Sequence, residues 1–421
     1  MDEPLADRPS GRRRPLSSLL GGIAVSQVGN MALAVAIPWF VFDTTGSAAR
    51  TGLASAALAA GSVLPPALAG PLIDRIGFKA TSVISDGIAA ASAMAIPLLH
   101  LSGLLEFWHV LLFVFLLSSF NAIGDSGRFA LLPGLAEIAA MPAERANSAE
   151  RSVVRFGQFA GPVLGGTLIT LIGAANVLFL DSATFIISAI LVAVGVPKPS
   201  PQVEEKPRRY LADLLEGFRF VKRNRLVFSM ILIVAWGNFL LMPLFLVILP
   251  VYAQTFWGDA AILGAVIGTF GVGAFAGTLL YGAVGEGWPR RATFLVGFIV
   301  APFIGYGALA ATPPLPIVFV AAALAGLIAG PINPIFLTVI QEATPASILG
   351  RTFGVVNALS YVGIPVGAVL AGYAVEAADV VVTVLVMGIS YVAVTMSMVF
   401  NPALRNMDDT RPMALNRGSN A

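Results

Sequence analysis

The chain has 421 residues, of which 57% are hydrophobic and only 11% are charged, and its formal net charge is +2. This composition is far more apolar than that of a soluble globular protein and predicts a polytopic membrane protein. The absence of cysteine excludes disulfides, thiolate metal sites and thiol catalysis. No phosphate-binding Gly-Lys-Ser/Thr loop occurs, so ATP hydrolysis by this chain is not expected.

Apolar segments long enough to cross a bilayer as helices recur along the whole chain. We expect twelve spans, near residues 17–42, 48–69, 80–101, 108–132, 149–172, 176–196, 226–254, 260–284, 291–311, 315–341, 350–375 and 378–400. The first span is too long, and too poor in a small-residue cleavage site, for a removable signal peptide. We therefore interpret it as retained.

The distribution of Lys and Arg predicts the orientation, because cations in short loops stay on the cytoplasmic side. Four arginines precede the first span: Arg8, Arg12, Arg13 and Arg14. With that end inside, the turn at 70–79, the loop at 133–148, the linker at 197–225, the turn at 285–291 and the loop near Arg351 all become cytoplasmic, with the C-terminal tail. Only Arg50 is then outside, and Arg128 lies within a span. We expect both termini in the cytoplasm and the protein in the bacterial inner membrane.

The long polar stretch at 197–225 separates six spans from six. The expected organisation is an N-terminal tail (1–16), a first bundle (17–196), this linker (197–225), a second bundle (226–400) and a C-terminal tail (401–421). Within the linker, apolar residues at 211, 214, 215, 218 and 221 follow a helical period, with basic residues on the other face. This pattern favours an interfacial helix on the anionic inner leaflet. A solvated, weakly helical linker is the alternative.

The two halves echo each other in sequence. Gly29-Asn30 recurs as Gly237-Asn238, the turn 70–74 recurs in degraded form at 282–286, and Gly161-Pro162 has a counterpart in residues 363–365. Paired repeats of this kind are typical of alternating-access transporters. The predicted fold is therefore an all-α membrane protein with twelve transmembrane helices in two six-helix pseudo-symmetric bundles around a central cavity.

Two short motifs resemble those of the major facilitator superfamily. The turn between the second and third spans carries Gly70, Asp74, Arg75, Gly77 and Lys79 at the positions of the superfamily motif, although Phe78 replaces a usual basic residue. The fifth span carries Gly157, Gly161, Pro162, Gly165 and Gly166, and it resembles the motif of proton-antiporting exporters. The resemblance implies that the first motif is a conformational switch, with Asp74 facing the eleventh helix. The glycines of the second allow close helix packing, and its proline bends the span.

Residues 129–133 with 145–148, and residues 341–345 with 350–354, are similar to the branch with macrolide and multidrug efflux pumps and catecholate-siderophore exporters. A related branch moves lysophospholipids. The resemblance extends from about residue 17 to residue 400. It implies export activity and leaves the substrate open.

Acids within the spans are candidates for coupling to a driving ion, because a charge buried in the membrane costs free energy and usually serves a function. They are Asp86, Asp125 and Asp181. We expect the driving ion to be H⁺. Asn121, Asp125 and Arg128 form one polar stripe at helical spacing, so Arg128 is a coupling candidate as well, and we expect Asp125 to be the most deeply placed acid on this stripe. Asp125 is either a protonation site or a structural relay that pairs with a cation; Asp86 and Asp181 fit helix packing better.

Neutral polar, aromatic and Met side chains occur in the spans that the resemblance assigns to the cavity: Gln27, Asn30, Trp39, Asn121, Trp236, Asn238, Met242 and Asn333. Such a site suits amphipathic organic molecules, although each amide is equally suited to an interhelical hydrogen bond. The leading hypothesis is a monomeric, proton-coupled drug exporter in contact with membrane lipids, without cofactor, metal or nucleic-acid partner. A siderophore or lysophospholipid exporter is the first alternative, and a transporter-like sensor or enzyme is a remote one.

Overall fold

The computed structural model describes residues 13–197 and 210–408, without the side chains at 67, 68, 71, 72, 74, 210–214, 286 and 406. Every regular element in these ranges is helical. The main helices are α1 (Arg14–Thr45), α2 (Ala48–Ile76), α3 (Phe78–Leu101), α4 (Phe107–Ile138), α5 (Ala143–Ile172), α6 (Ala174–Gly195), α7 (Tyr210–Arg223), α8 (Arg225–Pro243), the π-helix η1 (Leu244–Ile248), α9 (Leu249–Phe256), α10 (Ala260–Val284), α11 (Arg290–Ala310), α12 (Leu315–Ala329), α13 (Ile332–Ala343), α14 (Leu349–Tyr361), α15 (Ile364–Ala378) and α16 (Val380–Ser397).

Ten helices or nearly continuous helical runs in the described part of the chain are long and apolar enough to cross a membrane. The helices α2 and α5 are not among them. Many large apolar side chains are exposed along these helices, as expected where lipid is the solvent. The chain is therefore a multi-pass membrane protein.

The predicted turn at 70–79 is shorter in the structure. Helix α2 continues to Ile76 and α3 starts at Phe78, so Gly77 alone separates them. Gly77 has φ 86°, a value that residues with a side chain rarely adopt. Charged residues do not stop a helix that leaves the hydrocarbon core, which is why the sequence pattern overestimates the turn.

Three spans that were expected to be continuous are interrupted. Residues 244–248 form a π-helix, and breaks separate α12 from α13 and α14 from α15. Pro334 has no N–H to donate to the Gly330 carbonyl, and the Thr278 hydroxyl of α10 donates to that oxygen instead, at 2.9 Å. Near the second break, Asn238 Nδ2 donates to the Ser360 carbonyl at 2.9 Å. Neighbouring helices thus satisfy backbone groups that the breaks set free.

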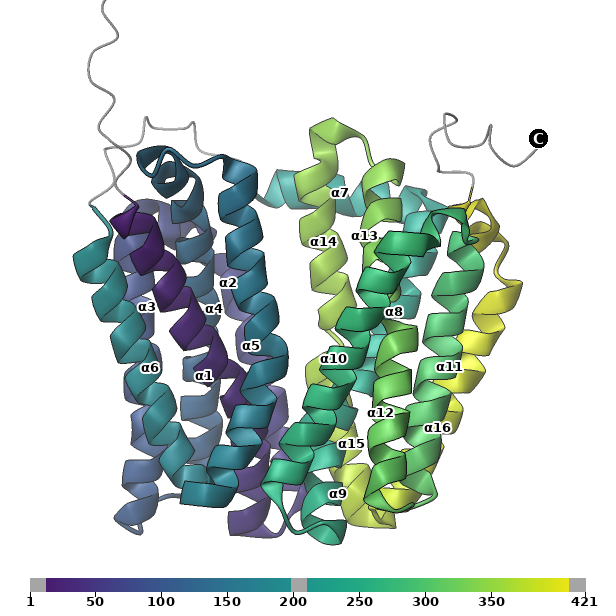
Figure 1. Cartoon of the computed structure of the whole chain (residues 1–421), viewed down its shortest axis with the longest axis horizontal. Helices are drawn as coiled ribbons and strands as arrows, with labels where there is room; N and C mark the ends of the chain where they lie inside the picture. Colours follow the sequence, from purple (N-terminus) through teal and green to yellow (C-terminus); the bar gives the residue numbers. More distant parts are fainter. Residues whose placement is uncertain (1–12, 198–209, 409–421) are drawn as a thin grey trace, which may run out of the picture. The chain divides into compact units, whose positions relative to one another are not determined.

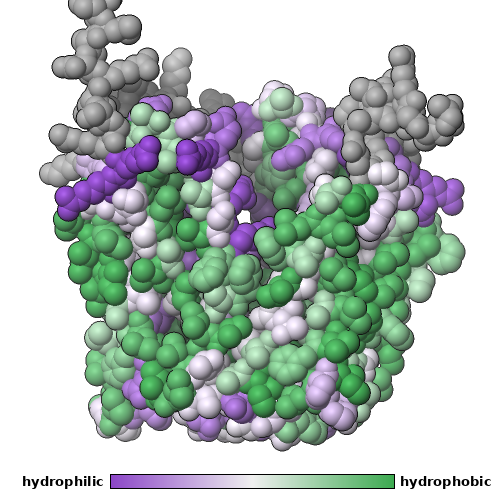
Figure 2. Space-filling model, viewed as in Figure 1, coloured by the Kyte–Doolittle hydropathy of each residue, from purple (hydrophilic) through white to green (hydrophobic). Residues whose placement is uncertain are grey.

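The chain divides into two compact units, residues 1–203 with 253–265 and residues 204–252 with 266–421. In the first unit α1 packs along α5 and α6, and α3 packs along α4 and α6 (Figure 1). In the second unit α11 packs on α12 and α16, and α14 packs on α7 and α8. On each unit, hydrophilic side chains gather near helix ends, and hydrophobic ones cover most of the stretch between (Figure 2).

Within the expected linker, Tyr210–Arg223 forms the helix α7, and residues 198–209 lie outside the described part of the chain. Gly217 lies against the backbone of Arg351 in α14, and Glu216 forms an ion pair with Arg351. Of the expected apolar face, Leu215 and Phe218 are 51% and 45% exposed, Val221 is buried, and the side chains at 211 and 214 lie outside the described residues. The location of α7 on the inner leaflet stays a prediction.

Candidate functional site: an acid–arginine cluster

Helix α4 packs close to α3 because two glycines of α4 face it. A Cβ atom at Gly124 would lie 3.2 Å from the Ser85 Cβ, and one at Gly127 would lie 2.9 Å from the Phe78 carbonyl oxygen. Larger residues at these positions would push the two backbones apart. The close approach brings the polar stripe of α4 within reach of Asp86 on α3.

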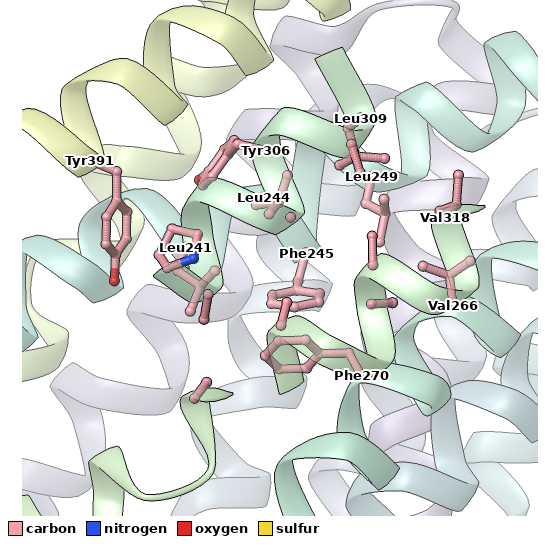
Figure 3. A pocket seen from close by; sticks show the side chains of 18 of the residues that line it. Leu241, Leu244, Phe245, Leu249, Val266, Phe270, Tyr306, Leu309, Val318 and Tyr391 are labelled. Atoms are coloured by element: carbon pink, nitrogen blue, oxygen red, sulfur yellow. The ribbon is translucent and has the colours of Figure 1, made fainter. Parts of the chain in front are cut away.

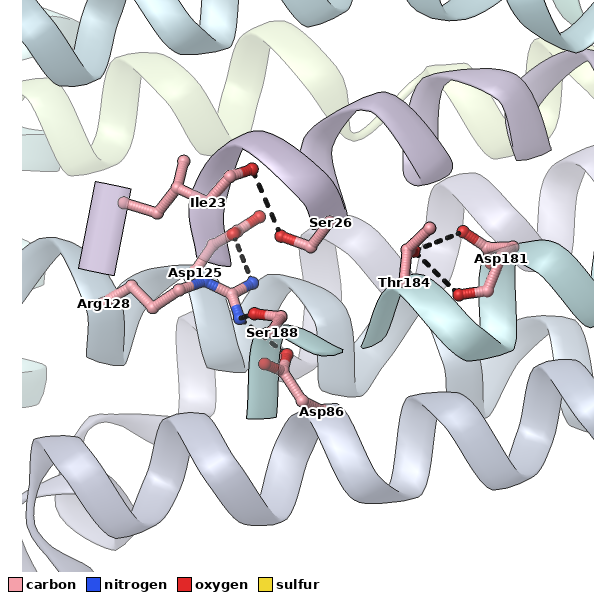
Figure 4. Close-up of polar contacts among 8 residues, drawn as sticks. All are labelled: Ile23, Ser26, Asp86, Asp125, Arg128, Asp181, Thr184 and Ser188. Carbon is pink, nitrogen blue, oxygen red and sulfur yellow. Dashed lines mark hydrogen bonds and ion pairs between the residues drawn. The ribbon is translucent and has the colours of Figure 1, made fainter. Parts of the chain in front are cut away.

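Arg128 of α4 joins two carboxylates (Figure 4). Its Nη1 donates to Asp86 Oδ1 at 2.6 Å, and its Nη2 donates to Asp125 Oδ1 at 2.7 Å. Nη1 also lies 3.4 Å from the Ser188 hydroxyl of α6. Ser188 was not identified from the sequence; its place two helical turns after Asp181, on the same helix face, is the signal that could have found it.

The two acids of the cluster differ in exposure. The side chains of Asp86 and Arg128 are 0% and 1% exposed, whereas that of Asp125 is 46% exposed. Asp86 of α3 is therefore the more deeply buried acid of the cluster, and the coupling role of Asp125, the acid of the α4 stripe, stays a prediction. The reason for the difference in burial is the helix rotation, which aims Arg128 at α3 and leaves Asp125 at the edge of the contact.

The cluster can change its charge distribution without leaving a buried cation unpaired. With both acids ionised, one guanidinium faces two carboxylates, and loss of the Asp125 charge would still leave Arg128 paired with Asp86. Asp86 Oδ2 and Arg128 Nε have no hydrogen-bond partner among the described residues. Buried ion pairs contribute little net stability because desolvation opposes their attraction, so this pair is a candidate for a functional role.

Asp181 occupies a separate buried position on α6. Asp181 is only 2% exposed, and the Thr184 hydroxyl lies 3.5 Å from its Oδ1 (Figure 4). In the described part of the chain it has no ion-pair partner, and Oδ2 makes no hydrogen bond. Gly29 of α1 faces it so closely that a Cβ would lie 2.6 Å from Oδ1. Asp181 is thus a second buried acid, without the arginine that Asp86 has.

The residues of the expected switch have mixed surroundings. Lys79 Nζ donates to the carbonyls of Ala193 and Val196, at 2.8 and 2.5 Å, and so caps the C-terminal end of α6. Arg75 is exposed, and nothing lies within 4 Å of a Cβ placed on Gly70. The side chain of Asp74 lies outside the described residues. The switch role of this motif stays a prediction.

The glycine motif of the fifth span packs directly against α1. A Cβ at Gly157 would lie 2.7 Å from Gln27 Cγ, and one at Gly165 would lie 2.7 Å from Ala32 Cα. Gly161 meets Met31 in the same way, and Gly166 meets the start of α10 at Ala260. Pro162 lies inside α5 and is buried. The motif therefore supplies two close helix contacts within the first unit.

The eight residues expected to contact the solute are spread over both units, and none lines the cavity found inside the second unit. Asn238 is committed to the Ser360 carbonyl, and the Trp39 carbonyl accepts from Gln254 Nε2 at 2.9 Å. The indole N–H of Trp236 is buried without a partner among the described residues, and Asn333 is exposed. The other four are half-buried or buried: Gln27, Asn30, Asn121 and Met242.

Comparisons with known proteins identify the family. Residues 17–419 match the family described as transmembrane secretion effector. The multidrug efflux pump Tap of Mycolicibacterium fortuitum is 30% identical over 406 residues, 94% of this chain and 98% of the relative. Macrolide efflux protein A of Streptococcus pyogenes is 23% identical over 84% of this chain and 87% of its own length.

A solved structure supports the same fold. The crystal structure of a bacterial homologue of the human lysosomal transporter Spinster aligns with a TM-score of 0.76 and 15% identity, over 96% of this chain and 99% of that one. At this identity the likeness concerns the fold alone. The family match and the relatives together show that the chain belongs to the transmembrane secretion effector family of the major facilitator superfamily.

Proposed function

We propose that this protein is a secondary active transporter that exports amphipathic drugs or similar small organic molecules in exchange for protons. The proposal draws on the family and on relatives named as a multidrug efflux pump and a macrolide efflux protein. It requires no cofactor, since the proton gradient supplies the energy. Alternating access would use twelve spans in two bundles around a central cavity.

The proposed orientation has both termini in the cytoplasm of a bacterium and the chain in its inner membrane. The support is the distribution of Lys and Arg among the loops. A cysteine at Ser102, an exposed residue of the α3–α4 loop, should react with an impermeant thiol reagent in intact cells. A cysteine at Gly350, also exposed, should react only after permeabilisation. The reverse labelling pattern would overturn the orientation.

The observation that carries the coupling proposal is the sharing of Arg128 between a buried and a half-exposed carboxylate. Asp125 would exchange protons, since it reaches the surface of its unit, while Asp86 would keep the buried guanidinium paired. Proton uptake by Asp125 would then weaken one ion pair and alter the packing of α4. Asp181 is the alternative proton site.

The test is efflux from proteoliposomes driven by an imposed pH gradient, with ethidium as the probe. Asp125→Asn removes the charge and keeps the shape. It should abolish uphill, protonophore-sensitive efflux and preserve exchange of ethidium down its own gradient. Glu137→Gln is the control, because it neutralises an exposed acid on the same helix. If uphill efflux and downhill exchange both fail in Asp125→Asn, Asp125 has a structural role. If gradient-driven efflux is unchanged, the coupling site is elsewhere, and Asp86→Asn and Asp181→Asn are the variants to measure next.

The substrate class has its own test. Expression in an efflux-deficient bacterium should raise resistance to several amphipathic drugs and lower their accumulation, and a protonophore should remove both effects. Resistance without protonophore sensitivity would contradict proton coupling. No change for any drug would direct attention to siderophores and lysophospholipids.

A further inference from the structure

The second unit contains a partly open cavity of its own. It measures about 80 Å³ and lies between the end of α8, η1, α10, α11 and α12 (Figure 3). The π-helical segment supplies Leu244 and Phe245 to its wall. A π segment carries an extra residue in one helical turn and is often found at functional sites. The cavity thus adjoins the most irregular part of this unit.

The walls of the cavity are apolar and combine rings with very small residues. Phe245 and Phe270 form one side, with ring centroids 5.1 Å apart and planes at 54°. Alanines of α11 and α12, including Ala301, Ala322 and Ala325, form the other. The small side chains leave the space that a larger residue would fill. No charged residue lines the cavity.

Two tyrosines line the cavity and differ in their hydrogen bonds. The Tyr306 hydroxyl donates to the Leu240 carbonyl at 3.0 Å. Tyr391 as a whole is only 2% exposed, and its hydroxyl makes no hydrogen bond among the described residues, although the hydroxyl oxygen is not one of the fully buried polar atoms. A hydroxyl that stays accessible beside an apolar wall gains free energy when an acceptor reaches it. The hydroxyl of Tyr391 is therefore available to an acceptor from outside the chain.

We infer that this cavity binds an uncharged ring with one hydrogen-bond acceptor, alone or as part of a larger molecule, and that Tyr391 donates to the acceptor. An engineered apolar cavity of about 150 Å³ holds benzene. A space about half as large surrounds only part of a six-membered ring, so the rest of the ring would extend through the part of the wall that half-buried lining residues such as Leu241 and Ala322 leave open. A charged group would find no counter-charge there. The unpaired Tyr391 donor favours an occupant with an acceptor over an acyl chain, which offers none within an apolar cavity.

This inference does not depend on proton-coupled export, because binding can be measured on the purified protein without a gradient. The probes are 4-fluoroacetophenone, which has a ring and a ketone, and fluorobenzene, which lacks the acceptor. Binding is followed by fluorine NMR line broadening in detergent. Ala322→Leu fills the cavity with an added isopropyl group and should abolish broadening of both probes. Ala393→Leu makes the same change at an exposed position of α16 and is the matched control for partitioning into detergent.

The second variant tests the hydrogen bond. Tyr391→Phe should weaken 4-fluoroacetophenone binding between about twofold and tenfold, the range expected for one hydrogen bond, and leave fluorobenzene unchanged. Equal binding of both probes by Ala322→Leu and the parent would overturn the site. An equal effect of Tyr391→Phe on both probes, or none on either, would overturn the role of the hydroxyl. If Ala322→Leu fails to fold, the Tyr391→Phe comparison decides the question. Absence of line broadening for both ring probes with the parent protein would overturn the proposal.

Discussion

Removal of Arg128 should destabilise the protein far more than removal of the charge of its half-exposed partner, Asp125. Arg128→Met leaves Asp86, which is 0% exposed, without its cation, and breaking a buried ion pair in this way costs about 3–5 kcal/mol. Asp125 is 46% exposed, and an exposed pair contributes about 0–1 kcal/mol. Arg128→Met should therefore lower the free energy of unfolding by about 2–5 kcal/mol more than Asp125→Asn does.

A double variant separates charge from packing. Asp86→Asn combined with Arg128→Met removes both buried charges, so it should recover most of the stability lost in Arg128→Met alone. The measurement is denaturant unfolding in detergent at neutral pH, followed by circular dichroism, with Glu137→Gln as the control for loss of an exposed acid. If the double variant is as unstable as Arg128→Met, or if Asp125→Asn is equally unstable, the guanidinium stabilises the fold by some means other than pairing with Asp86.

Two further predictions concern backbone contacts. Gly165→Ala should destabilise the first unit by about 1–3 kcal/mol through overpacking against α1. Gly87→Ala, with nothing within 4 Å of its Cβ, should be neutral or slightly stabilising in the same unfolding assay. Equal effects of the two variants would mean that α5 can move away from α1. Thr278→Val should cost about 1–3 kcal/mol because the Gly330 carbonyl loses its donor, and Pro334→Ala should reduce that loss by restoring a backbone N–H. Additive effects of Thr278→Val and Pro334→Ala would show that the two donors do not serve the same carbonyl.

Much of the site's composition, but little of its geometry, was predictable from the sequence. The membrane spans could be located because an apolar helix must reach across the hydrocarbon, a requirement of length and composition alone. The polar stripe with Asp125 and Arg128 could be found because helical spacing places such residues on one face. The breaks at Gly330 and Gly363 were missed because the segments around them stay apolar, and hydropathy does not register a lost hydrogen bond.

The family and the membrane class followed from the sequence by itself, since short motifs and long apolar segments are local properties of the chain. Tertiary structure decided which carboxylate is buried. Asp86 and Arg128 are 42 residues apart, and their pairing depends on the rotation and spacing of α3 and α4, which Gly124 and Gly127 set by contact. It also decided that Asn238 serves the Ser360 carbonyl and that small residues on α11 and α12 leave a cavity beside Tyr391. Such features arise from side chains of several helices at once, so no single segment of the sequence contains them.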